Sequence, residues 1–227
     1  MPIKPILFNT EMVRAILDER KSCTRRLVKH DVEAVLNSQY HKEHPEVEDK
    51  QIISKLCNPP YQPGDILYVR ETWKKAPNGY YYYEDWQKDD IADVTKWKPS
   101  IHMPKEAARI WLKVTNVRVE RLQEIDEDGV WDEGFRFKPP CLTRVSADGH
   151  TCDLDGPCTS SIKYCDMTMG ELFGRELWNS TIKKSDLDRY GWDANPWVWV
   201  IEFERCEKPA ESPYAWNDAI HKLTKGV

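Results

Sequence analysis

Alternation of apolar and polar residues and runs of strand-forming residues predict the β-strands in this chain. The segment "ARIWLKVTNVRVERL" (108–122) alternates apolar with polar residues over a long stretch and predicts one long strand. Shorter runs rich in β-branched and aromatic residues predict three more strands, at "KPILF" (4–8), "ILYVRET" (66–72) and "NPWVWVIEFERC" (195–206). The pair Asn78-Gly79, which precedes the aromatic run "YYYYEDW", predicts a β-hairpin.

Helical spacing of apolar residues predicts three helical segments. "EMVRAILDER" (11–20) has one apolar face, and Thr10 is its expected N-cap. Asp126 is expected to cap a short helix in "EDGVWDEGF" (127–135), and "MTMGELFGRELWNSTI" (167–182) also has helical periodicity. Strands and helices do not alternate regularly, which argues against a doubly wound parallel sheet. We therefore expect an α+β fold, mostly β, built as a mixed or antiparallel barrel with peripheral helices.

Two segments interrupt this pattern. Residues 30–60 are polar and weakly periodic, and we expect a solvated insertion with some helix. Residues 136–165 hold four cysteines and many turn formers, which predicts an irregular excursion. The expected organisation is a single domain over residues 1–206 that carries both insertions, followed by a loosely docked tail over 207–227.

Composition and charge narrow the function classes. The chain has 227 residues and a formal net charge of −5, which argues against a protein that coats nucleic acid without specificity. No apolar run approaches the ~20 residues of a membrane span, and the N-terminus lacks a signal-peptide pattern. We therefore expect a cytoplasmic protein with no membrane partner, in which the seven cysteines stay reduced. The sequence does not specify an oligomeric state.

The stretch "DERKSCTRRLVK" (18–29) concentrates positive charge in this acidic chain, because five of its twelve residues are Lys or Arg. A threonine hydroxyl such as that of Thr24 is a poor nucleophile unless a base removes its proton. Lys21 can be that base only when its amine is neutral, which cationic neighbours favour. Residues three apart in a strand face opposite sides, so Lys21 and Thr24 meet only if the chain turns. Taken by itself, the spacing favours a solvated basic turn after a helix whose C-terminus attracts cations.

The order of motifs resembles the ASCH-domain family, which has a PUA-like fold, and especially ASCH proteins of phages and prophages. The family pattern Gly-x-Lys-x-x-Thr-x-Arg is matched by Lys21, Thr24 and Arg26, while Glu19 stands at the position where Gly is usual. A second family hallmark, a glutamate commonly followed by Gly after the long strand, is matched by Glu133-Gly134. The resemblance covers residues 3–30, 60–135 and 170–205.

Small bacterial members of this family are amidohydrolases that release acetate from N4-acetylcytidine. The resemblance implies catalytic roles for Lys21 as base, Thr24 as nucleophile, and Glu133 as the group that orients Lys21 or relays a proton. Arg26, or a backbone N–H of the turn, would stabilise the oxyanion. This chemistry requires no cofactor, and the ligand is a small nucleoside or a short RNA. The alternative is a non-catalytic RNA or modified-base binding module that uses the same pocket.

Further residues have two interpretations each. Glu71 and Trp73 lie at a strand end, where they could bind a base as substrate-binding residues; alternatively Glu71 pairs with Arg70 and Trp73 fills the core. Cys23 is expected to be a packed small residue rather than a nucleophile. Four further cysteines either hold a structural zinc or stay free thiols: Cys141, Cys152, Cys158 and Cys165.

Overall fold

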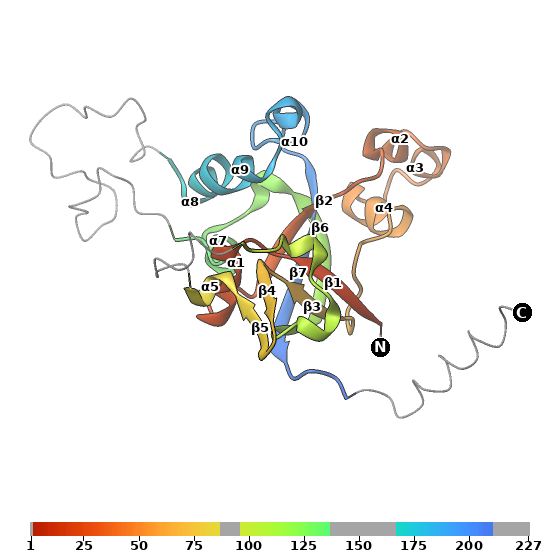
Figure 1. Cartoon of the computed structure of the whole chain (residues 1–227). Coiled ribbons are helices and arrows are strands. Elements are labelled where there is room, and N and C mark those ends of the chain that lie inside the picture. The colour runs from red at the N-terminus through yellow and green to blue at the C-terminus, as the bar shows by residue number, and fades with distance from the viewer. Residues whose placement is uncertain (1, 87–95, 137–166, 211–227) are drawn as a thin grey trace, which may run out of the picture.

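The computed structural model describes residues 2–86, 96–136 and 167–210. Its centre is a five-stranded mixed sheet with the strand order β1-β3-β6-β7-β2 (Figure 1). The strands are β1 (Ile3–Leu7), β2 (Cys23–Leu27), β3 (Ile66–Arg70), β6 (Trp111–Arg121) and β7 (Trp197–Cys206). Only β1 and β3 pair in parallel within this sheet. The predicted α+β class, organised around a mixed sheet, is confirmed.

The sheet does not close into a barrel within the described residues. Strand pairing ends at β1 on one side and at β2 on the other. The two edges approach each other through a side chain, because Arg26 Nη2 on β2 donates to the Leu7 carbonyl at the end of β1 over 2.9 Å. Strand β2 therefore keeps one free edge, and the candidate site lies along it.

The remaining strands form the predicted hairpin. β4 (Trp73–Ala76) and β5 (Gly79–Tyr82) pair in antiparallel fashion, with Pro77 and Asn78 in the turn. Gly79 has a φ of 143°, a conformation that L side chains rarely adopt. The hairpin pairs separately from the five-stranded sheet.

Helices surround the sheet. They are α1 (Thr10–Leu17), α2 (Val32–Leu36), α3 (Gln39–Glu43), α4 (Asp49–Leu56), α5 (Tyr83–Trp86), α7 (Glu127–Asp132), α8 (Met169–Leu172), α9 (Asn179–Thr181) and α10 (Leu187–Tyr190). A π-helical turn, Phe173–Trp178, joins α8 to α9. The N-cap of α1 is Asn9 rather than the predicted Thr10, because the Asn9 side chain accepts from the Met12 N–H. Asp126 caps α7 as predicted.

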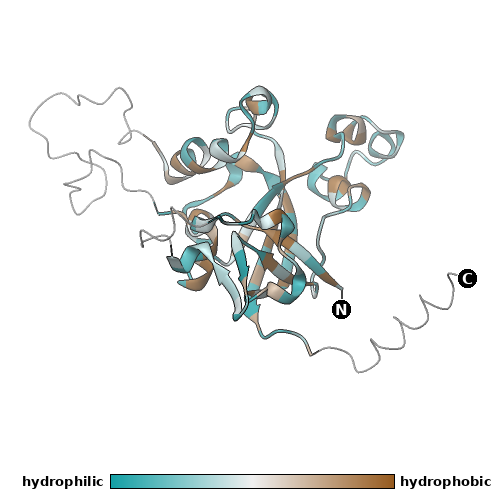
Figure 2. Cartoon of the chain, viewed as in Figure 1, coloured by the Kyte–Doolittle hydropathy of each residue, from teal (hydrophilic) through white to brown (hydrophobic). Residues whose placement is uncertain are grey.

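Both faces of the sheet are buried. Side chains alternate along β7, so that Trp199 and Ile201 pack in the main core cluster while Val198 packs in a second one. Figure 2 shows the corresponding hydrophobic residues along the central strands and on parts of the surrounding helices. The insertion at 30–60 contains α2, α3 and α4, and Ile53 of α4 packs in the main core. No helix in the described ranges is long and apolar enough to span a membrane.

Candidate functional site

A tight turn after α1 directs Lys21 back toward the helix. The amides of Arg20 and Lys21 both donate to the Ala15 carbonyl, over 2.8 and 3.0 Å. This turn requires a left-handed residue, and Glu19 adopts it with a φ of 59°. A side chain at that φ strains the backbone by roughly 1–2 kcal/mol relative to glycine. The local geometry therefore gives a physical reason why glycine suits the first position of the Gly-x-Lys-x-x-Thr-x-Arg pattern.

The turn residues pair with the end of α7. Lys21 and Glu133 form an isolated antiparallel bridge, and the Ser22 amide donates to the Asp132 carbonyl over 2.9 Å. Gly134 follows with a φ of 77°, and a Cβ there would lie 2.7 Å from the Ala15 Cβ and 3.0 Å from the Lys21 Cβ. The close approach of α1 and the turn thus requires glycine after Glu133.

A single carboxylate, that of Glu133, organises the candidate site. Lys21 Nζ donates to Glu133 Oε2 over 2.5 Å and to the Glu133 carbonyl over 3.0 Å. The other oxygen, Glu133 Oε1, accepts the Arg25 backbone N–H over 2.6 Å. Both residues are buried, with 4% of Lys21 and 4% of Glu133 exposed. A buried ion pair costs desolvation energy, so its remaining lone pairs and protons need partners such as these.

Thr24 lies beside this carboxylate without bonding to it. The peptide bond between Thr24 and Arg25 carries the N–H that Glu133 accepts. Thr24 is 1% exposed and pairs with Ile201 across β2 and β7. Within the described residues its hydroxyl makes no hydrogen bond to Lys21 or Glu133. The structure thus joins Lys21 to Glu133 directly and brings Thr24 next to them through the backbone.

The cations expected to surround Lys21 have their own partners. The Arg25 side chain donates to Glu120 Oε1 through Nε and Nη2, over 3.0 and 2.8 Å, and lies against Glu133. Burial works against the charged form of Arg25, but Glu133, with a contribution from Glu120, outweighs it and raises the pKa of Arg25. Arg20 pairs with Asp18. Arg25 is therefore a clamp between β2, β6 and α7, and sequence reasoning missed Glu120 as its partner.

Arg26 differs from Arg25, because no described carboxylate lies within ion-pairing distance of it. Its guanidinium lies 5.4 Å from the centre of the Phe8 ring, and Lys21 Nζ lies 5.6 Å from the same ring. Burial lowers the pKa of Arg26. Arg26 lies on the same face of β2 as Thr24, because the two residues are two positions apart in the strand.

Within the described residues, neither Glu71 nor Trp73 forms a hydrogen bond or an ion pair with Lys21 or Glu133. Glu71 is 2% exposed and accepts Arg109 Nε and Nη2 on its two oxygens, each over 2.9 Å. Arg109, not Arg70, is thus its ion-pair partner. Trp73 is buried in a hydrophobic cluster that includes Met103 and Trp111, and its ring lies near that of Tyr80. Trp73 thus fills the core, as in the second interpretation of the sequence, whereas the partner expected there for Glu71, Arg70, is wrong.

The cysteine predictions divide between described and undescribed residues. Cys23 is 3% exposed, and burial raises the pKa of its thiol to about 12, which fits a packed residue. Cys141, Cys152, Cys158 and Cys165 lie outside the described residues, so the zinc hypothesis stays a prediction. In the part of the chain that is described, no cluster of three His, Cys, Asp or Glu side chains could hold a metal ion.

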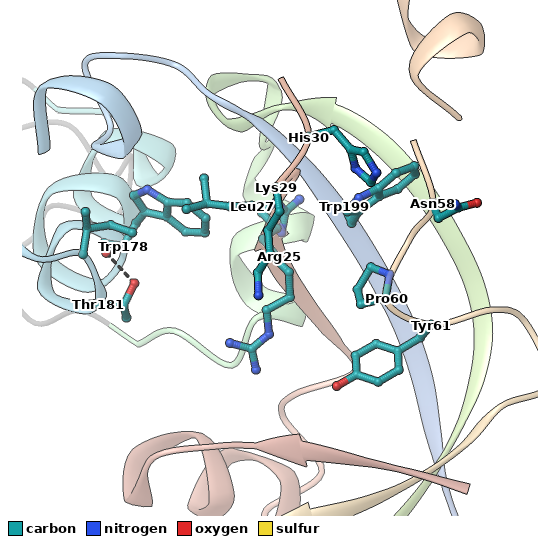
Figure 3. Close-up of a pocket in the computed structure, with 12 residues that line it drawn as sticks. Arg25, Leu27, Lys29, His30, Asn58, Pro60, Tyr61, Trp178, Thr181 and Trp199 are labelled. Carbon is teal, nitrogen blue, oxygen red and sulfur yellow. Dashed lines mark hydrogen bonds between the residues drawn. The ribbon is translucent and has the colours of Figure 1, made fainter. Parts of the chain in front are cut away.

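A cleft of about 530 Å³ follows the free edge of β2. Trp178 and Thr181 form one side and Asn58, Pro60 and Tyr61 form the other, as Figure 3 shows. Arg25 and Arg26 belong to its lining, whereas Lys21, Thr24 and Glu133 do not. Arg25 links the buried pair to the cleft, because it lines the cleft and its backbone N–H donates to Glu133. A smaller hollow of about 290 Å³ reaches Glu133 from the side of α1.

Comparisons with known proteins do not assign this chain to a family. No protein-family model matches it. No curated protein matches it either. The chain is similar to a solved structure described as hypothetical protein PH0355, with 12% identity over 91% of this chain and 100% of that chain. The TM-score of that superposition is 0.35, which is too low to support an argument about fold or function.

Proposed function

We propose that this protein is an ASCH-type amidohydrolase that removes an acyl group from the exocyclic nitrogen of a nucleoside such as N4-acetylcytidine. The observation that carries the proposal is the buried Lys21–Glu133 pair, whose carboxylate also holds the amide that follows Thr24. A purely structural ion pair needs no hydroxyl beside it. Here Lys21 meets a glutamate 112 positions away, and the peptide bond that follows Thr24 donates to the same carboxylate.

The proposed reaction begins with a proton shift along the 2.5 Å contact from Lys21 Nζ to Glu133 Oε2, which leaves a neutral amine. That amine takes the Thr24 hydroxyl proton as Oγ1 attacks the acyl carbonyl carbon. The C–N bond then breaks, the exocyclic nitrogen leaves with a proton returned from Lys21, and the acyl group stays on Thr24 as an ester. Water hydrolyses the ester to release the carboxylic acid and regenerate Thr24.

The oxyanion needs a hydrogen-bond donor, and the two predicted candidates differ in how many of their N–H groups already have described acceptors. The amides of the turn are occupied, because Arg20 and Lys21 donate to Ala15 and Ser22 donates to Asp132. The Arg26 guanidinium has five N–H groups and uses one described acceptor, the Leu7 carbonyl. We therefore assign this role to Arg26, which requires its side chain to move so that the acyl group reaches Thr24 from the cleft.

Incubation with N-acylated nucleosides, with products identified by mass, tests the proposal. Thr24→Ala should abolish release of the acid while nucleoside binding stays measurable. Lys21→Arg should also be inactive, because arginine does not act as a base at neutral pH. Turnover that survives in Thr24→Ala would remove Thr24 from the mechanism, and an active Lys21→Arg variant would remove Lys21 as the base.

A second candidate function, a non-catalytic reader of RNA or a modified base, is favoured by a specific observation. The Thr24 hydroxyl is buried and bonds to neither proposed partner within the described residues. A reader would bind acylated nucleosides through the cleft and leave them intact. The same incubation separates the two functions, because the reader predicts binding with no product in the wild type.

A further inference from the structure

We propose that the end of the cleft at Lys29, His30 and Asn58 binds the phosphate group of a nucleotide whose base points toward Thr24. This inference rests on the proposed function for the orientation of the base. It names the ligand as a phosphorylated nucleotide, either free or within a short RNA, rather than a neutral nucleoside.

The charge of the cleft lining supports an anionic ligand. The lining contains two arginines, a lysine and a histidine, and none of its described residues is Asp or Glu. Arg25 is neutralised by Glu120, but Lys29 and His30 are exposed and have no carboxylate within ion-pairing distance among the described residues. In a chain with a net charge of −5, such a cleft attracts an anion locally.

The cleft also has the chemistry that a nucleotide requires beyond its phosphate. Trp178 lines one side of the cleft, and Trp199 and the half-buried Tyr61 line the other side (Figure 3). The Asn58 side chain offers both a donor and an acceptor at the same end as His30. A volume of about 530 Å³ lies within the range of small-ligand sites. Aromatic walls with a cationic end suit a base and a phosphate respectively.

The length of the cleft matches this arrangement. Pairing of β2 with β7 continues beyond the strand, because the Val28 amide donates to the Trp197 carbonyl over 3.0 Å. Lys29 therefore lies about 10 Å along an extended chain from Arg26. Residues three apart face opposite sides of a strand, but both line this cleft because it follows the free edge of β2. That separation is close to the length of a nucleotide from its exocyclic amine to its phosphate. An acylated base beside Arg26 and Thr24 would thus place its phosphate at Lys29 and His30.

The free edge of β2 adds a backbone donor. Residues 22 and 28 bond to β7, and the alternation of an antiparallel ladder turns the amides of Cys23, Arg25 and Leu27 toward the open side. Glu133 takes the Arg25 amide, which demonstrates this direction. The Leu27 amide, on the stretch between Arg26 and Lys29, faces the cleft and can donate to the sugar or phosphate.

Isothermal titration of the full chain with non-acylated ligands tests the inference. The ligands are cytidine, its 5′- and 3′-monophosphates, and a short cytidine oligoribonucleotide. We expect at least one monophosphate to bind about tenfold more tightly than cytidine, since hydrogen bonds to charged groups are the stronger ones. Lys29→Gln and His30→Gln should each reduce this advantage about threefold or more. Lys208→Gln, at the far end of β7, is the matched control and should leave it unchanged.

Each outcome has a defined meaning. An oligoribonucleotide that binds more tightly than the monophosphate, with affinity that falls more steeply between about 0.05 and 0.2 M salt, identifies RNA as the source of the phosphate. Equal affinities identify a free nucleotide. Equal binding of cytidine and both monophosphates would overturn the inference, as would an advantage that Lys29→Gln and His30→Gln leave intact. Because these ligands carry no acyl group, the result is independent of whether the chain hydrolyses an amide.

Discussion

Removal of the Glu133 carboxylate is the perturbation whose cost follows most directly from the structure. In Glu133→Ala the Lys21 ammonium, whose side chain is 0% exposed, keeps one hydrogen-bond acceptor among the described residues, the residue 133 carbonyl at 3.0 Å. The Arg25 amide loses its 2.6 Å acceptor. Breaking a buried pair by removing one partner costs about 3–5 kcal/mol. We expect the free energy of unfolding to fall by about 4 kcal/mol.

Urea denaturation followed by tryptophan fluorescence measures this change. With a slope of about 2 kcal/mol per molar urea, the midpoint should fall by about 2 M. Glu204→Ala is the control, because Glu204 forms an exposed pair with Lys113 over 3.4 Å, and such pairs contribute about 0–1 kcal/mol. Lys21→Met with Glu133→Leu should recover part of the loss, since neither charge remains buried. A Glu133→Ala midpoint within error of the Glu204→Ala midpoint would refute the reasoning.

Three further predictions address the local geometry. Glu19→Gly should raise the free energy of unfolding by about 0.5–1 kcal/mol, because glycine accepts the φ of 59° without strain. Glu19→Ala, the control, should give no comparable gain. Equal stabilisation of both variants in urea denaturation would assign the gain to the loss of the charge instead. Gly134→Ala should cost about 2–4 kcal/mol, from backbone strain and from overlap with the Ala15 Cβ at 2.7 Å. Gly64→Ala, also at positive φ but with no atom within 4 Å of the new Cβ, should show only the strain, so similar melts for both variants would contradict the overlap. Because burial raises the pKa of the Cys23 thiol to about 12, iodoacetamide at about pH 8 should modify Cys206 well before Cys23, as peptide mass mapping would show; equal rates would contradict this.

The strands with strong period-two patterns were predictable, but β2 was not. β6 has a long alternating segment and β7 a long run rich in β-branched and aromatic residues, and both strands form where these patterns predict them. In β2 the two faces are both packed, so Thr24 and Arg25 are buried on opposite faces and no contrast between apolar and polar residues marks the strand. The basic composition of residues 18–29 therefore predicted a solvated turn. The structure has the turn, but the short strand β2 follows it within the same stretch.

The candidate site was predictable as far as its residue types, but not in its pairings. Lys21, Thr24 and Glu133 came from motif order, while the clamp between Arg25 and Glu120 joins residues 95 positions apart and leaves no local signal. The same limit explains Glu71, whose partner is Arg109, 38 positions away, rather than the adjacent Arg70. The left-handed turn at Glu19 was hidden because glycine, the residue that marks such a turn, is absent there.

The central claim is that Thr24 receives the acyl group, and the mass of its peptide during turnover tests this most directly. The protein is mixed with excess N4-acetylcytidine, quenched with acid within one turnover, digested and analysed by mass spectrometry. The account predicts a fraction of the peptide that contains Thr24 heavier by one acetyl group, with none in Thr24→Ala. Release of cytidine with no acetyl group on Thr24 at any quench time would contradict it.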